Sequence, residues 1–250
     1  MKLLGVSGIC GPLTRISRDT FKGCESLGHM DIPESVEFIG SHAFSGCYSL
    51  EQITLGESLT MISDATFQHC CSLTRIAIPA SVGFIGAAAF QNCNSLENIL
   101  IYGPLTCISR DTFKGCESLK RMVIPALVTV IGQGAFEECC SLERVIMPES
   151  LTVIGNKAFK HCSRLLEISI PRRVQTIEVD AFIGCVSLRS IYMHTSLGYD
   201  AEEAFDENAV ASITLFEDDS SGPSQTPFLE WRQKKMPLTY KSWQPSLPLA

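Results

Sequence analysis

Cysteine and histidine are the residues of this chain that could do chemistry. The sequence has 12 Cys and 5 His among 250 residues, and two short runs bring the types together, His69-Cys70-Cys71 and His161-Cys162. Thiolates and imidazoles at suitable spacing bind zinc, and pairs of thiols form disulfides. The Cys-x-x-Cys spacing of common zinc sites is absent from the sequence.

Most of the cysteines belong to a repeat of 23 residues. Nine phenylalanines recur at this spacing without insertion or deletion: Phe21, Phe44, Phe67, Phe90, Phe113, Phe136, Phe159, Phe182 and Phe205. The two His-Cys runs occupy the same point of the repeat, four repeats apart. At a strand spacing of ~4.8 Å this separates them by about 20 Å, too far to share one ion. We therefore predict no metal site and no cofactor.

Two interpretations of the cysteines are open. Eight of them follow a repeat phenylalanine by three residues, namely Cys24, Cys47, Cys70, Cys93, Cys116, Cys139, Cys162 and Cys185; the other four are Cys10, Cys71, Cys107 and Cys140. Disulfides along the stack are one interpretation, but stacked repeats hold their side chains parallel, whereas a disulfide needs Cβ atoms turned towards each other at about 3.8 Å. Small buried hydrophobic residues are the favoured one.

The rest of the repeat predicts short strands. A Leu six residues after each of the first eight of these Phe leads into apolar pairs such as Ile76 and Ile78, which would point to one side of a strand while the residue between them faces out. A proline such as Pro79 ends that strand, and a second apolar group, for example Val36 and Ile39, predicts a second short parallel ladder. Ala-Phe-x-x-Cys predicts one short 3₁₀ or helical turn. One repeat cannot bury its own apolar face, so the repeats must stack around a continuous core.

This pattern resembles the BspA-type leucine-rich repeat, as in IPESVEFIGSHAFSGCYSLEQITL. The resemblance implies a β-rich solenoid, a curved right-handed coil with a parallel β-sheet on its concave side, used for protein binding and sometimes for surface adhesion. It covers residues 11–216, about nine repeats. Residues 1–10 resemble a degenerate half repeat, and residues 217–250 read as a linker and a C-terminal tail or cap. The segment GPLTRISRDTFKGCESL at 11–27 recurs with one change at 103–119, which suggests duplication of four repeats.

The sequence favours a protein without catalytic activity. It has no G-x-S-x-G, phosphate-binding glycine loop, H-E-x-x-H or EF-hand pattern. A net charge of −7 argues against nucleic-acid binding, and no stretch reaches the roughly 18 apolar residues of a membrane span. No convincing signal peptide is present. This and the unpaired cysteines favour a cytoplasmic location, with secretion or the cell surface still open.

The variable strand positions indicate a binding surface. Apolar residues gather in the middle of the array beside arginines and Asn98, and a patch of this kind is typical of protein interfaces. The candidate residues are Arg75, Ala77, Asn98, Leu100, Arg121, Val123, Arg144, Ile146 and Tyr192. We therefore predict a monomeric scaffold whose concave face binds an unidentified protein partner. The alternative function is a surface-adhesion or structural array. The alternative explanation of the patch is that its β-branched residues only favour strand formation and bind no partner.

A second candidate motif lies in the tail. Both tryptophans follow the last repeat, and Phe228 and Trp231 could form part of a linear motif for a partner. The alternative is that this segment docks on the last repeat as a cap.

Overall fold

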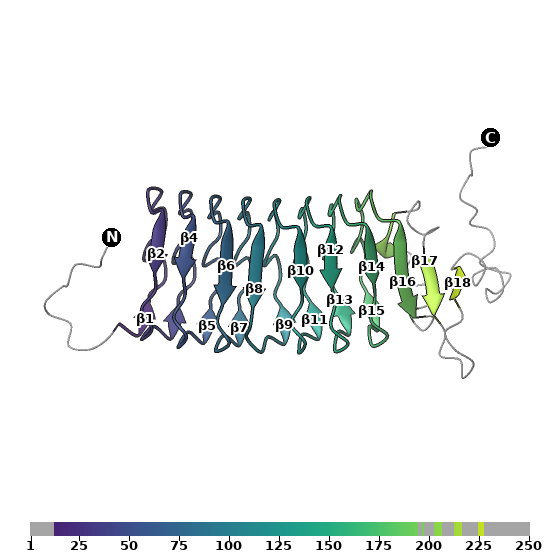
Figure 1. Cartoon of the computed structure of the whole chain (residues 1–250), viewed down its shortest axis with the longest axis horizontal. Helices are drawn as coiled ribbons and strands as arrows, with labels where there is room; N and C mark the ends of the chain where they lie inside the picture. The colour runs from purple at the N-terminus through teal and green to yellow at the C-terminus, as the bar shows by residue number, and fades with distance from the viewer. Residues whose placement is uncertain (1–12, 195–196, 198–202, 207–212, 217–224, 228–250) are drawn as a thin grey trace, which may run out of the picture.

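The structure is a computed structural model that describes residues 13–194, 197, 203–206, 213–216 and 225–227. The chain winds into a solenoid of stacked turns, as the resemblance implies (Figure 1). Each turn contributes one longer and one shorter strand. The longer strands are β2 (His29–Asp31), β4 (Gln52–Thr54), β6 (Arg75–Ile78), β8 (Asn98–Ile101), β10 (Arg121–Val123), β12 (Arg144–Ile146), β14 (Glu167–Ser169) and β16 (Ser190–His194). The shorter strands are β1 (Arg15–Ile16), β3 (Phe38–Ile39), β5 (Met61–Ile62), β7 (Phe84–Ile85), β9 (Cys107–Ile108), β11 (Val130–Ile131), β13 (Val153–Ile154) and β15 (Thr176–Ile177).

Neighbouring turns pair in parallel and in register. Arg75 lies opposite Asn98 and Ala77 opposite Leu100, so each residue meets its equivalent one repeat later. The shorter strands pair in the same way, with Val130 opposite Val153. The long-strand ladder is interrupted after β8 and after β12, and the short-strand ladder between β7 and β9.

The last described strands depart from this regularity. In β17 (Ile213–Phe216), Ile213 pairs with Ile191, a spacing of 22 residues, so this repeat is one residue shorter up to the strand. The next strand, β18 (Gln225–Pro227), runs antiparallel to β17 and covers its outer edge. β18 lies in the segment that the sequence predicts to form a linker and a C-terminal tail or cap. Residues 1–10, Cys10, Phe228 and Trp231 lie outside the described residues.

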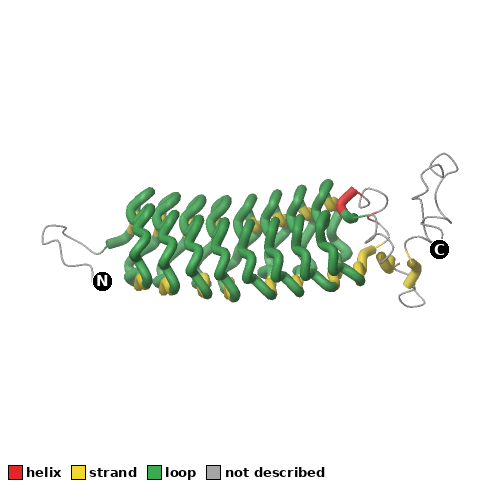
Figure 2. The backbone as a smooth tube through the Cα atoms, turned by 90° about the horizontal axis from the view of Figure 1, so that it is seen from above, coloured by secondary structure: helices red, strands yellow, loops and turns green. Residues whose placement is uncertain are grey.

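The core is a column of phenylalanine rings. From Phe21 to Phe205, successive ring centroids are 4.8–5.6 Å apart and the ring planes differ by 3–18°. Seven of these nine rings, Phe44 to Phe182, are completely buried. Their spacing is close to the ~4.8 Å between strands, so the inside and the sheet side of the stack advance by similar steps. The solenoid accordingly bends only slightly along its length (Figure 2).

Tight turns, and not helices, carry the phenylalanines. The Cys47 amide donates to the carbonyl of Phe44 and the Leu50 amide to that of Cys47, the i to i+3 pattern of a 3₁₀ turn. Left-handed residues stop these turns from extending, with φ of 57° at His42 and 73° at Gly46. Amides of residues 42, 44 and 46 then donate to carbonyls of residues 64, 66 and 68 in the next turn. The turn side is therefore hydrogen-bonded along the stack, also where the strand ladders are interrupted.

Each buried ladder cysteine donates a hydrogen bond to the repeat before it. The thiols of Cys47, Cys70, Cys93, Cys116, Cys139, Cys162 and Cys185 lie 3.1–3.2 Å from the carbonyl oxygen of the preceding repeat's phenylalanine. The cysteines of the described residues are all unpaired, which confirms the interpretation as small buried residues for these seven; it is wrong for Cys24, which is exposed because it lies in the first described repeat. Burial raises the pKa of Cys47 to about 11 and that of Cys185 to about 12, and it raises those of the ladder thiols between them well above the ordinary value. These thiols therefore stay protonated and can donate.

We expect Cys116→Ala to lower the free energy of unfolding by about 0.5–1.5 kcal/mol, because the buried carbonyl of Phe90 loses the bond from this thiol but keeps the bond from the Cys93 amide. Cys140→Ala is the control, since that thiol is exposed one residue beyond the ladder. Urea unfolding followed by circular dichroism measures both. Equal stability of the two variants would show that the thiol bond contributes nothing.

Candidate functional site

The outward surface of the longer strands, here called the long-strand face, carries the predicted site. The strands alternate exposed and buried residues, as in Arg121–Met122–Val123, where only the middle residue is buried. Equivalent residues of successive turns lie side by side because the strands pair in register. Two exposed rows result, one beginning at His29 and one at Asp31.

Three apolar side chains form a ridge in the middle of this face. Leu100, Val123 and Ile146 are 55%, 64% and 54% exposed. Leu100 occupies the position of this row on β8, and Val123 and Ile146 are register partners on β10 and β12. The structure thus places all three predicted apolar residues on this surface, with Leu100 on the turn next to that of Val123 and across the break in the ladder between β8 and β10. Exposed β-branched residues favour strand formation, but that propensity does not account for Leu100.

Shallow grooves flank the ridge where the same row has small residues. The first has a volume of about 660 Å³ and lies over β4, β6 and β8, around Ala77. The second has about 330 Å³ and is lined by Ile146, Ser169 and Tyr192. Tyr192 is half-buried at the far side of the second groove, so it bounds the site and does not join the ridge. The row therefore alternates hollow, ridge and hollow.

The second exposed row supplies positive charge beside the ridge. Arg75, Arg121 and Arg144 are all exposed. Arg144 donates to Glu167 at 3.2 Å, a contact between largely exposed side chains. Within the described part of the chain, neither Arg75 nor Arg121 forms an ion pair. Asn98 lies between these two arginines in the row, opposite Arg75. Two guanidinium groups are thus available to carboxylates of a ligand.

The N-terminal end of the face has a different character. His29 lies 3.3 Å from Asp31, and hydrogen bonds from Thr54 and His29 lower the pKa of the Asp31 carboxyl. These side chains satisfy one another and are separated from the ridge by β6. His29 and Asp31 form no part of the apolar site, whereas Thr54 lines the first groove.

Tyr102 is a site residue that the prediction missed. It is 64% exposed and lines the first groove together with Leu100. Most repeats have Pro at this position, directly after the strand pair, as at Pro79 and Pro125. The substitution of an aromatic residue for that proline was the signal that could have identified it.

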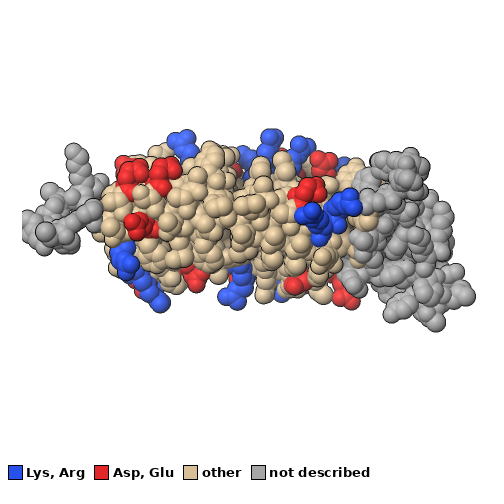
Figure 3. Space-filling model, turned by 90° about the horizontal axis from the view of Figure 1, so that it is seen from below, with Lys and Arg blue, Asp and Glu red and all other residues tan. Residues whose placement is uncertain are grey.

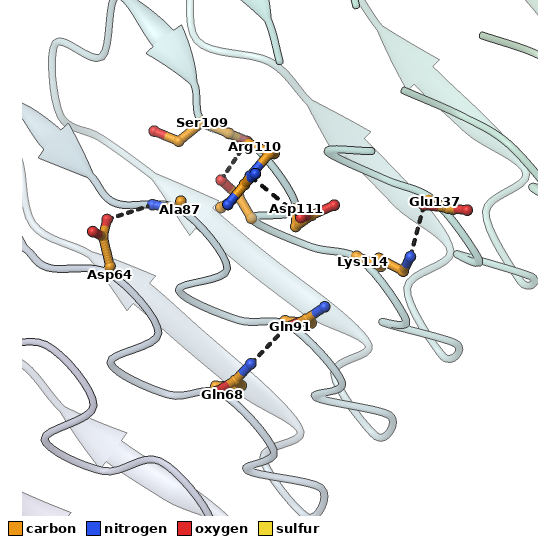
Figure 4. Close-up of polar contacts among 10 residues, drawn as sticks. Asp64, Gln68, Ala87, Gln91, Ser109, Arg110, Asp111, Lys114 and Glu137 are labelled. Atoms are coloured by element: carbon orange, nitrogen blue, oxygen red, sulfur yellow. Dashed lines mark hydrogen bonds and ion pairs between the residues drawn. The ribbon is translucent and has the colours of Figure 1, made fainter. Parts of the chain in front are cut away.

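The polar residues of the turn side join successive repeats. The Gln68 side chain donates to Gln91 at 2.6 Å, Lys114 to Glu137 at 2.8 Å, and the Ala87 amide to Asp64 (Figure 4). The Glu137 bond raises the pKa of Lys114. Each of these contacts links residues about one repeat apart, so the side chains serve the stack.

The two His-Cys runs are explained by backbone geometry. His69 and His161 have φ of 61° and 62°, at the turn position where four other repeats have left-handed glycines: Gly23, Gly46, Gly115 and Gly184. Across the described ranges, no three His, Cys, Asp or Glu side chains gather closely enough to hold a metal ion. Nor do those ranges contain a helix with the length and apolar character needed to cross a bilayer.

The family comparison covers most of the chain. The profile of the BspA type Leucine rich repeat region matches in 6 copies, over residues 14–143 and 129–222. No curated protein matches the sequence.

Solved leucine-rich repeat structures are similar to this chain. One is a leucine-rich repeat protein from Eubacterium ventriosum, with 28% identity and a TM-score of 0.63 over 68% of this chain and 46% of that one. Another is a leucine rich cell surface protein from Faecalibacterium prausnitzii, with 28% identity and a TM-score of 0.53 over 83% and 64% of the two chains. The T. pallidum leucine-rich repeat protein has 30% identity and a TM-score of 0.51 over 73% and 74%. The chain thus spans about half of the first of these proteins and under two thirds of the second.

Proposed function

Because the chain belongs to the BspA-type leucine-rich repeat family, we propose that it is a non-catalytic scaffold that binds a protein partner on its long-strand face. The observation that carries the proposal is the ridge of Leu100, Val123 and Ile146, each more than half exposed, beside Arg75 and Arg121. A contiguous apolar patch bordered by arginine has the composition of an interface centre.

The shape of the face limits the partner. The two grooves around Ala77 and Ser169 lie four repeats apart, about 19 Å at ~4.8 Å per strand. An extended segment of roughly six residues spans that distance, as does a helix of roughly 13 residues. Such a segment would fill the grooves with apolar side chains and offer carboxylates to the arginines.

Leu100→Asp combined with Ile146→Asp is expected to weaken partner binding by at least about 30-fold, the loss typical of a central interface residue. Both side chains are exposed, so the fold should survive, and circular dichroism checks this. The measurement is affinity capture followed by titration of the captured protein. Val186→Asp is the matched control, because Val186 is 80% exposed and lies outside this face. Unchanged binding by the double variant would exclude the ridge as the site.

A second candidate function is adhesion or a structural role at a cell surface. It is favoured by the similarity to the Faecalibacterium prausnitzii structure, which is described as a leucine rich cell surface protein. Labelling of intact source cells with a membrane-impermeant biotin reagent tests it. Labelling would support a surface role, and protection from the reagent until the cells are lysed would exclude it.

A further inference from the structure

The short strands carry a second apolar surface, on a side of the solenoid away from the proposed site. The first residue of each short strand from β3 to β15 faces outward and is half-buried or exposed. We call these residues the short-strand row: Phe38, Met61, Phe84, Cys107, Val130, Val153 and Thr176. Six steps of ~4.8 Å make the row about 29 Å long.

Uncharged residues surround the middle of this row. The residue before each member from Met61 to Val153 is Thr or Gly, and four of the five are Thr: Thr60, Thr106, Thr129 and Thr152. Figure 3 views this side of the molecule and shows a continuous stretch without charged side chains along the centre, with charges at the margins and the two ends. A stretch of this length without charge is the surface that an interface centre requires.

The side chains of the row are large at its N-terminal end and small at its C-terminal end. Phe38, Met61 and Phe84 precede Cys107, and three small residues follow it. The row thus has three members on each side of Cys107. A second row placed against it in the antiparallel direction would set every large side chain opposite a small one.

The charges at the two ends are also complementary. Glu37 is exposed directly before Phe38, at the N-terminal end of the row. At the other end, Arg172 and Arg173 line a surface depression together with Thr152 and Gln175. A two-fold axis at Cys107 carries the second repeat onto the eighth, which brings Glu37 of one copy to the arginines of the other. The same axis makes the interface isologous, the common form in homodimers.

We propose that the chain forms an antiparallel homodimer through its short-strand row, with the two-fold axis at Cys107. Phe84 of one copy then packs on Val130 of the other, Met61 on Val153, and Phe38 on Thr176. The two Cys107 thiols face each other at the centre. This assembly differs from the monomer that the sequence predicts, and it leaves the long-strand face of both copies open.

The interface is small, which sets the conditions of the test. Four strand residues, counted from the threonine before each row member, span about 13 Å across the row. With the row length of about 29 Å, the contact covers on the order of 400 Å² of each copy. Interfaces below about 1,200 Å² in total are weak and transient. We therefore expect association that depends on concentration, measured by sedimentation equilibrium from about 10 to about 500 µM. The expected change is from the chain mass of 27.4 kDa towards twice that mass.

Cross-linking at Cys107 tests the register. In a background with Cys10, Cys24, Cys71 and Cys140 replaced by Ser, Cys107 is the accessible thiol of the described residues, because the remaining ladder thiols are buried. A short bismaleimide, in which each maleimide adds one thiolate across its C=C bond, should link two copies. Cys107→Ser in the same background should remove the product.

Substitutions distinguish dimerisation through the short-strand row from partner binding on the long-strand face. Phe84→Lys should weaken dimerisation at least about tenfold without unfolding the chain, since Phe84 is 42% exposed. Leu100→Asp should leave the dimer unchanged. Glu37→Lys and Arg173→Glu should each weaken it, and the two together should restore it. A chain that stays monomeric at 500 µM, or a Phe84→Lys variant that dimerises and cross-links as well as the parent, would overturn the proposal. A monomer whose row instead captures a different protein would overturn it as well.

Discussion

Phe113→Ala should lower the free energy of unfolding by about 3–5 kcal/mol, the usual cost of truncating a buried aromatic side chain. Phe113 is completely buried in the middle of the column, with ring centroids 5.6 Å from Phe90 and 5.3 Å from Phe136. Truncation removes both ring contacts and leaves a cavity that cannot easily collapse, because the turns on both sides and the strands on the C-terminal side are hydrogen-bonded to their neighbours.

Urea unfolding followed by circular dichroism measures this effect at low protein concentration, where the chain is monomeric. Phe84→Ala is the matched control, because the same truncation is made at an exposed phenylalanine of the neighbouring repeat. It should cost well under 1 kcal/mol, as surface substitutions do. Each repeat contacts only its neighbours, so Phe113→Ala should also broaden the transition as the two halves of the stack uncouple. A loss similar to that of the control would show that the column does not stabilise the fold.

Gly103→Ala should destabilise the solenoid by about 1–3 kcal/mol, the usual cost of overpacking. A Cβ atom at Gly103 would overlap the carbonyl oxygen of Val82 and lie 3.2 Å from that of Pro79. Both obstacles are backbone atoms of the preceding repeat, so a change of rotamer cannot relieve the clash.

Gly83→Ala is the control for this substitution, because a Cβ there meets no atom within 4 Å. That change should be neutral or stabilising by up to about 1 kcal/mol through the loss of backbone freedom in the unfolded chain. Thermal unfolding of both variants measures the difference. Equal melting temperatures would mean that the chain at 103 shifts to accept the methyl group, and that the close approach is not required.

The repeat made the fold predictable from the sequence. A spacing of 23 residues without insertion fixes which residues stack, so the phenylalanine column, the buried cysteines and the exposed position of Val123 all follow from pattern and strand alternation. The parts that could not be predicted depend on backbone geometry. The left-handed conformation of His69 is one example, since glycine at equivalent positions is its only signal. The break between β8 and β10 is another.

The ridge could be predicted from the sequence and the short-strand row could not, for a physical reason. A residue between two buried strand residues must face out, so the ridge could be identified by alternation alone. The short strands have only two residues, such as Phe84–Ile85, and too little alternation to show which one faces out. The pattern therefore predicts only the buried residues of this segment, such as Ile39, and makes no prediction for the residue before each of them, although Phe84 is 42% exposed.

The thiol bonds between repeats also bear on how such an array changes length. Every buried ladder cysteine donates to the phenylalanine carbonyl of the unit before it, so the junctions from Cys47 to Cys185 have the same donor and the same acceptor. A duplicated block brings as many donors as acceptors, and no buried carbonyl is left without its partner at either new joint. The near-identical segments at 11–27 and 103–119 are four units apart. Copying whole units is therefore tolerated by the core, and variation can accumulate on the outward rows that meet other molecules.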